Sequence, residues 1–202
     1  ILIVSSDQMH ETELASEARK AGIAVILFVG SGETLQDSEM CPAGGLCISV
    51  DKYGTALDYY DREIYPPGPE GLSQNGFVIT AQKRVEELDP GFVADRVIWV
   101  APDLDEDLPS VEVAGRKVAP GGDLVVVLDS SILPDSIKLR GVMTLLENTG
   151  LSVDSNQYTL EEIIGDPKSG NPGILPGLKS SYFLPREPGL KTIVITAYRP
   201  NN

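Results

Sequence analysis

The sequence predicts an α/β protein built on a mostly parallel β-sheet that helices cover on both faces. Short, fully apolar runs alternate along the 202 residues with stretches of helical composition, a pattern typical of strands buried on both faces. Two of these runs end at Gly30 and Asp51, and parallel sheets of this class bind ligands at the carboxyl ends of their strands. A chain of this length is expected to form a single domain with a sizeable core.

Elements in the first part of the chain are bounded by glycine, proline and aspartate, which end helices and strands. Ala21 and Gly22, for example, follow a helical stretch and provide its stop signal. The expected elements are a strand at 1–4, a helix at 11–20, strands at 23–29 and 46–50, a helix at 55–62, a loop at 66–71 and a strand at 76–80.

The second part continues the alternation and adds one long irregular segment. The expected elements are a strand at 96–100, a turn at Pro120-Gly121-Gly122, a strand at 123–128, an amphipathic helix at 137–149 and a last strand at 191–197. Residues 165–188 are rich in glycine, proline, serine and lysine. Because long loops in compact domains are more often functional than idle, we expect this segment to contribute to an acceptor site or its lid.

The chain is strongly acidic, with a formal net charge of −14 at pH 7. This charge argues against a nucleic-acid partner, since surfaces that bind nucleic acid depend on clustered lysine and arginine. The densest acidic run, Asp103-Leu104-Asp105-Glu106-Asp107, is interpreted as a solvated loop or, alternatively, as a surface for a basic protein partner. No apolar run is long enough to span a membrane, and no secretion signal is recognised, so a cytoplasmic location is expected.

Cys41 and Cys47 are the two cysteines of the chain. One pair is not a disulfide framework, and a C-x5-C spacing with a single histidine is not a zinc signature, so no metal site is expected. We interpret both as reduced, structural thiols. The alternative is one disulfide that closes the Pro42-Ala43-Gly44-Gly45 loop.

The candidate ligand site joins a glycine loop to an acidic residue. Gly30, Ser31 and Gly32 follow one apolar strand, and Asp51 follows the next, 19 residues after Gly32. Glycines let the backbone approach a ligand, and a carboxylate at the second strand end can accept hydrogen bonds from both hydroxyls of a ribose. The pattern indicates a nucleoside-binding βαβ unit.

Several segments resemble class I S-adenosylmethionine (SAM)-dependent methyltransferases, over roughly residues 23–200. Phe28 to Thr34 lies where that family has its first motif, and Val50 to Leu57 resembles its acidic second motif and the following helix. Further segments resemble its fourth strand, its proline-glycine-glycine turn with the fifth strand, the helix end before its sixth strand, and its seventh strand. They are residues 95–100, 116–127, 145–151 and 192–198.

The resemblance implies a Rossmann-like fold with an extra N-terminal strand–helix unit. It divides the single domain 1–202 into an N-terminal extension at 1–22, a cofactor-binding half at 23–90 and a substrate half at 91–202. It implies SAM as the cofactor and names no catalytic residue. The implied cofactor contacts are Gly30, Ser31, Gly32, Asp51, Lys52, Arg84, Val85 and Ala101.

The chain departs from the family pattern at several positions. Phe28 stands where the family usually has an acid, Thr34 replaces its third glycine, and Arg84 falls where an acid near the adenine is common. Ala101-Pro102-Asp103 follows the fourth strand in place of an Asn-Pro-Pro-Tyr motif. The departures put in doubt methylation at an exocyclic amino nitrogen of a base and the hold on the amino acid end of SAM.

Simpler interpretations stand beside these. A tight strand-to-helix turn alone would account for Gly30 and Gly32, capping of a helix for Asp51, and burial in the core for Trp99. Two functions therefore remain: SAM-dependent methyl transfer to a small-molecule or protein acceptor, and a catalytically inactive methyltransferase-like domain that serves as a protein-binding or assembly module. A Rossmann-like protein for another nucleotide is a third hypothesis.

Overall fold

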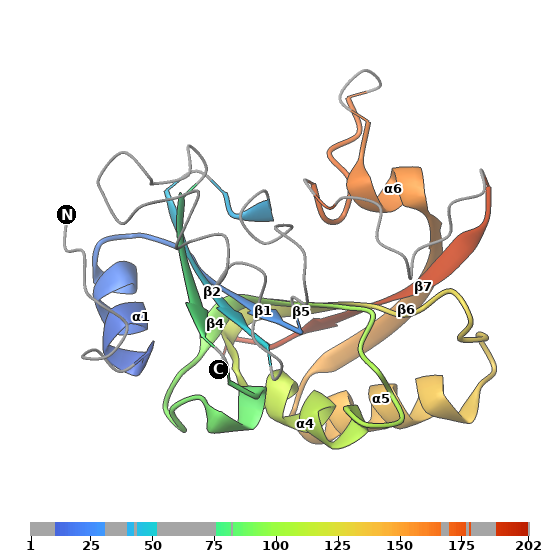
Figure 1. Ribbon diagram of the computed structural model, residues 1–202, viewed down its shortest axis with the longest axis horizontal. Coiled ribbons are helices and arrows are strands. Elements are labelled where there is room, and N and C mark those ends of the chain that lie inside the picture. Colours follow the sequence, from blue (N-terminus) through green and yellow to red (C-terminus); the bar gives the residue numbers. More distant parts are fainter. Residues whose placement is uncertain are drawn as a thin grey trace.

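The computed structural model describes residues 11–30, 40–42, 44–51, 76–81, 83–166, 170–176, 178 and 189–201. The strands and helices within these ranges form one seven-stranded sheet with helices packed on it (Figure 1). The elements are α1 (Glu11–Lys20), β1 (Val25–Val29), β2 (Gly45–Val50), β3 (Gly76–Ala81), the 3₁₀ turn η1 (Val85–Glu87), β4 (Ala94–Val100), α4 (Leu108–Arg116), β5 (Val118–Val127), α5 (Ile137–Asn148), β6 (Ser152–Thr159), α6 (Leu160–Ile164) and β7 (Lys191–Tyr198).

The strand order is β3-β2-β1-β4-β5-β7-β6. The first five strands in this order are parallel, whereas β7 runs antiparallel to both β5 and β6. Every residue of β1 and β2 is buried, which explains why these strands are continuous apolar runs rather than alternating ones. The predicted mostly parallel α/β fold is confirmed.

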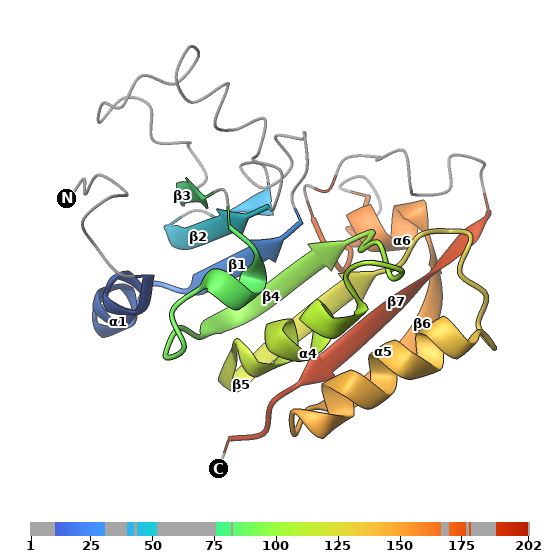
Figure 2. The same cartoon turned by 60° about the horizontal axis from the view of Figure 1, so that its bottom comes forward.

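Two hydrophobic clusters cover opposite faces of the sheet. The larger one packs α1, α4 and α5 against the sheet through residues such as Ala15, Val111 and Leu146, and Figure 2 shows α4 and α5 side by side on that face. The smaller one covers the other face with α6 and with Leu175 and Leu178. Figure 1 shows α6 across the sheet from α4 and α5.

Leu175 and Leu178 lie within the irregular segment predicted at 165–188. Each is 1% exposed, and the Leu175 N–H donates to the Ile163 carbonyl at 2.8 Å. This part of the segment therefore belongs to the core. Its expected role in an acceptor site stays a prediction for the remainder, much of which lies outside the described residues.

Most predicted elements are observed within one or two residues of their expected bounds, but the predicted turn at Pro120-Gly121-Gly122 is wrong. These residues lie inside β5, where Val118 pairs with Ala94 and Asp123 with Arg96, so five residue steps along β5 span two along β4. The extra residues bulge out of the ladder without ending the strand. The predicted strand at 1–4 and helix at 55–62 lie outside the described residues.

The apolar runs of the sequence did not predict strand β6 or helix α4. Strand β6 is the polar run Ser152–Thr159 at the edge of the sheet, where half-exposed side chains are tolerated. Helix α4 contains both Pro109 and Gly115, residues that normally argue against a helix, but the proline occupies the first turn, where no backbone donor is lost.

The interpretation of the cysteines as reduced thiols is also wrong. Cys41 and Cys47 form a disulfide, which closes the short loop before β2. Both residues are buried in the smaller hydrophobic cluster. The alternative interpretation, a single disulfide that closes the loop between the two cysteines, is the one observed.

Candidate functional site

A cavity of about 300 Å³ opens at the carboxyl ends of β1, β2 and β4. Four groups of residues line it, one from each of these strand ends and one from the segment that follows β3. The lining residues are Val29, Gly30, Val50, Asp51, Lys83, Arg84, Val85, Glu86, Trp99, Ala101, Pro102, Asp103, Glu106, Asp107 and Ser110. This is the sheet edge at which α/β proteins bind ligands.

Five of the eight residues predicted as cofactor contacts line this one cavity. They are Gly30, Asp51, Arg84, Val85 and Ala101, which come from four separate stretches of the chain. Ser31, Gly32 and Lys52 lie outside the described residues. The structure thus brings the described candidates together, and their part in cofactor binding stays a prediction.

Gly30 ends β1 in a conformation that only glycine adopts readily. Its φ is +66°, and its N–H donates to the Val50 carbonyl at 2.9 Å. A Cβ at this position would lie 2.8 Å from Nε1 of Trp99. The tight turn proposed as the simpler interpretation is present, and it leaves the backbone at the cavity free of any side chain.

Asp51 follows β2 directly and is 7% exposed. Its strand neighbour Val50 pairs in register with Val29 of β1, so Asp51 and Gly30 stand at equivalent positions, one residue beyond adjacent parallel strands. A buried carboxylate is found where hydrogen-bond donors are supplied to it. Capping of a following helix stays open as its role, because residues 52–75 lie outside the described part of the chain.

The cavity wall that follows β3 contains both basic and acidic side chains. Lys83 forms an ion pair with Glu11 of α1, and the N–H of exposed Arg84 donates to Oε2 of Glu87 at 2.6 Å, which fixes the turn η1. Glu86 accepts a hydrogen bond from the Ser110 hydroxyl of α4. This last contact joins two walls of the cavity, and the sequence did not indicate Ser110 because α4 itself was not predicted.

The wall after β4 begins with a strained residue. Ala101 has a φ of 51° and is the one non-glycine residue with positive φ in the described part of the chain. Its N–H donates to the Val127 carbonyl at 2.7 Å, which anchors the turn to β5. Non-glycine residues in this conformation are uncommon and cluster at binding sites. Here the strained residue is itself part of the cavity wall.

The acidic run Asp103–Asp107 follows this turn and holds its own shape. The N–H of Asp103 donates to Asp107 at 3.1 Å, the N–H of Asp105 donates to Asp103 at 3.0 Å, and Asp105 pairs with Lys138 of α5 at 2.6 Å. Asp103, Glu106 and Asp107 line the cavity. Among the residues described, no group of three or more acidic, histidine or cysteine side chains could hold a metal ion.

Phe28 occupies the position of the acid expected two residues before the first glycine. It is 2% exposed and packs in the smaller cluster, with Cys47 and Ile98, on the face opposite the larger cluster to which Val29 and Trp99 belong. Neighbouring strand residues point to opposite faces, so position 28 presents no side chain to the cavity. Carboxylates reach the cavity from β2, η1 and the acidic run instead.

The whole chain can be superposed on solved methyltransferase structures. The 16S rRNA (adenine(1408)-N(1))-methyltransferase from Catenulisporales acidiphilia is 15% identical, with a TM-score of 0.62 over 99% of this chain and 96% of that one. The 16S rRNA methyltransferase KamB gives a TM-score of 0.64 at 14% identity, over 96% of each chain. The antibiotic-resistance methyltransferase Kmr gives 0.61 at 19% identity, over 98% of this chain and 96% of that one.

This chain has the class I methyltransferase fold. At such low identity the likeness establishes the fold, as the order of motifs in the sequence predicted, and leaves the activity to be argued from the site. No protein-family model matches the chain, and a search of curated proteins finds no match. None of the helices described is long and apolar enough to cross a membrane.

Proposed function

We propose that this protein binds SAM in the cavity at the ends of β1, β2 and β4 and transfers its methyl group to an acceptor. The observation that carries the proposal is the convergence of Gly30, Asp51, Arg84, Val85 and Ala101 on one cavity. A structure of the Catenulisporales acidiphilia enzyme contains cosubstrate SAM, which supports the same cofactor for a chain of the same fold.

The residues of the cavity fit a nucleoside with a charged tail. Gly30 has no side chain, so a ligand can approach its backbone closely. A side chain at this position would also collide with Trp99. The carboxylate of Asp51 is suited to accept from ribose hydroxyls, and Val85 offers an apolar surface to a base. Bound SAM supplies an activated methyl group, so the protein's task is to align an acceptor nucleophile and exclude water.

We expect an acceptor that is a small molecule or a protein. The structural neighbours named above include enzymes for 16S rRNA, but this chain has a net charge of −14 and its cavity is lined by five carboxylates and two basic side chains. Such a surface repels a polyanion. A basic or neutral acceptor suits it better.

Isothermal titration with SAM and S-adenosylhomocysteine tests the proposal. Wild-type protein is expected to bind in the micromolar range, and Asp51→Ala to weaken binding by about 100-fold, because hydrogen bonds to a charged group each contribute about 1.5–3 kcal/mol. Asp154→Ala, which removes an exposed carboxylate from the edge strand β6, is the matched control and should bind like wild type. Absence of binding at millimolar ligand would reject the proposal.

The second candidate is an inactive methyltransferase-like domain that acts as a binding or assembly module. Phe28 favours it, because this side chain is committed to the core and no acid stands at that position. Binding of SAM without methylation of any basic protein or small-molecule acceptor in a panel would support this module. A panel of other nucleotides in a thermal-shift assay tests the third hypothesis, since a bound ligand raises the melting temperature.

A further inference from the structure

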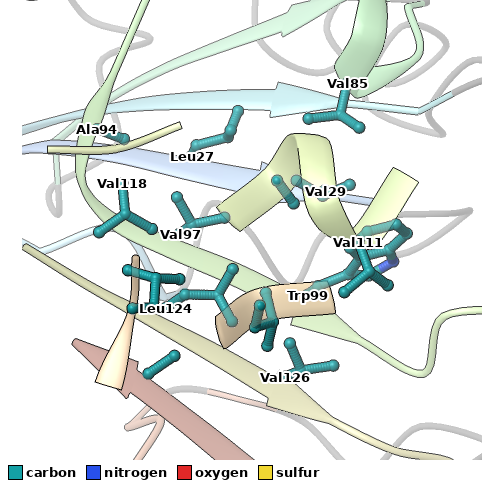
Figure 3. Packing of buried hydrophobic residues seen from close by; sticks show 14 of the residues in the cluster. Leu27, Val29, Val85, Ala94, Val97, Trp99, Val111, Val118, Leu124 and Val126 are labelled. Atoms are coloured by element: carbon teal, nitrogen blue, oxygen red, sulfur yellow. The ribbon is translucent and has the colours of Figure 1, made fainter. Parts of the chain in front are cut away.

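Trp99 places a hydrogen-bond donor at the cavity. It is the chain's one tryptophan, is 3% exposed, and belongs to the larger hydrophobic cluster with Val29 and Val111 (Figure 3). The residue also lines the cavity. An indole Nε1–H can only donate, and in the part of the chain that the structure describes it makes no hydrogen bond.

The position of Nε1 explains how this donor stays without a partner. Every fully enclosed side-chain nitrogen or oxygen of the described residues has a hydrogen-bond partner, so the unpartnered Nε1 is not fully enclosed, and the residue that carries it lines the cavity. It points toward Gly30, where an added Cβ would lie 2.8 Å away. The missing side chain at residue 30 therefore keeps a path open from the cavity to the indole N–H.

The strand register gives the separation between the backbone of Trp99 and the end of the strand before Asp51. Trp99 pairs with Val29, which pairs with Val50 on its other side. Two strand spacings, about 10 Å, thus separate the end of β2 from β4. A ligand whose ribose is held at Asp51 has its base toward β3 and its other end toward β4.

We infer that the Trp99 Nε1–H donates a hydrogen bond to the carboxylate of the amino acid tail of SAM. The inference rests on the proposed function. Of the groups in that tail, only the carboxylate is a strong acceptor, since the ammonium and the sulfonium carry positive charge. The donor on β4 thus anchors the tail from the strand next to β1, whose own position 28 is occupied by a core phenylalanine.

The residues after Trp99 complement the other charge of the tail. Asp103, Glu106 and Asp107 line the same cavity within eight residues of the indole. Carboxylates there favour the ammonium group over the carboxylate, so the zwitterion has a preferred orientation: carboxylate toward Nε1 and ammonium toward the acidic run.

A ligand pair separates this contact from general binding. S-adenosylhomocysteine carries the tail carboxylate, whereas 5′-methylthioadenosine lacks the amino acid tail. Trp99→Phe keeps an aromatic ring and removes the donor, so calorimetry should give about tenfold weaker binding of S-adenosylhomocysteine and unchanged binding of 5′-methylthioadenosine. Val111→Ala, which loosens the same cluster but does not line the cavity, should not discriminate between the ligands.

A measurement on the wild-type protein keeps the test independent of how well the variant folds. With one tryptophan in the chain, a ¹H–¹⁵N spectrum has one indole N–H resonance. S-adenosylhomocysteine should shift it downfield, and 5′-methylthioadenosine should shift it much less. An equal response to both ligands, or equal losses of affinity in Trp99→Phe, would overturn the inference while leaving SAM binding intact. Failure of the wild-type protein to bind either ligand would instead reject the proposed function and this inference with it.

Discussion

Gly30 illustrates how tightly single residues are constrained at the cavity. Its backbone has a φ of +66°, and the space where a Cβ would stand is taken by the Trp99 indole. Two separate physical requirements, one of the backbone and one of packing, disfavour every other residue type at this position. A glycine explained by conformation alone would tolerate a small side chain at modest cost.

Gly30→Ala is therefore expected to lower the free energy of unfolding by about 2–4 kcal/mol, from the left-handed backbone and the collision together. Gly22→Ala is the matched control, because Gly22 has a φ of +72° with no atom within 4 Å of the added Cβ. That variant should cost only about 1–2 kcal/mol. Urea denaturation measures both free energies of unfolding. Equal losses of stability in the two variants would show that the Trp99 indole moves aside at no cost.

At the scale of elements, Arg199 connects the ends of two helices to the sheet. Its guanidinium donates to the carbonyls of Val118, Thr149 and Gly115 at 2.7, 3.0 and 2.9 Å. Thr149 caps α5 and Gly115 lies in the last turn of α4, where helix carbonyls lack partners and a cation is favourable. One side chain after β7 thus fixes the helical layer that backs the cavity.

Arg199→Ala should lower the free energy of unfolding by about 2–4 kcal/mol, because three carbonyls lose a charged donor. Arg199→Lys should recover little of this loss, since a single ammonium does not reproduce the fork of a guanidinium. Arg140→Ala removes an exposed arginine from α5 and should change stability by no more than about 0.5 kcal/mol. Thermal or urea unfolding monitored by circular dichroism distinguishes these outcomes.

Helix α6 begins with a reciprocal capping box. The Thr159 N–H donates to Oε2 of Glu162 at 2.7 Å, and the Glu162 N–H donates to the Thr159 hydroxyl at 3.3 Å. The hydrogen bonds from Thr159, first from its backbone and then from its side chain, hold the pKa of Glu162 below its ordinary value of 4.5. The box orients α6 so that Ile163 enters the smaller cluster.

A lowered pKa of Glu162 in the folded state means that its ionised form favours folding. This contribution is present above pH 4.5, the ordinary value, and is lost as the pH falls through the lower folded value. Glu162→Gln should therefore be less stable than wild type at neutral pH, and the difference in stability should shrink as the pH falls below 4.5. Glu161→Gln removes a neighbouring charge but keeps the box, and a pH series of urea midpoints that shows the same trend for both variants would contradict this account.

At the scale of the whole molecule, the acidic net charge leads to a prediction about nucleic acid. Because the chain has 30 acidic and 16 basic residues, we expect it to repel polyanions at long range, although it shares a fold with rRNA methyltransferases. A shared fold does not imply a shared partner, because the strand order depends on buried apolar residues, whereas the electrostatic field depends on surface charge.

Filter binding with 16S rRNA is expected to detect no complex at about 150 mM salt, where phosphate contacts rather than fold determine retention. Lowering the salt should produce little gain, because few phosphates would be neutralised. A steep rise in affinity as the salt is lowered would reveal a local basic surface and would contradict the expected small-molecule or protein acceptor.

The sequence by itself determined the parallel sheet and five of the fifteen residues that line the cavity. Continuous apolar runs must be buried on both faces, and residues directly after such strands, as at Gly30 and Asp51, necessarily meet at one edge. Polar β6 has no continuous apolar run. The proline and glycine of α4 argued against a helix despite the helical spacing of its apolar residues, so Ser110 was missed with its helix.

Only the tertiary structure decided how distant residues act on one another. Trp99 was predicted as a core residue and is one, but that its nitrogen faces Gly30 depends on the register of β4 against β1. The Cys41–Cys47 disulfide and the bulge in β5 likewise depend on backbone distances set by the folded sheet. Burial is a property of residue type and is legible in sequence, whereas register and contact are relations between segments and exist only once the chain is folded.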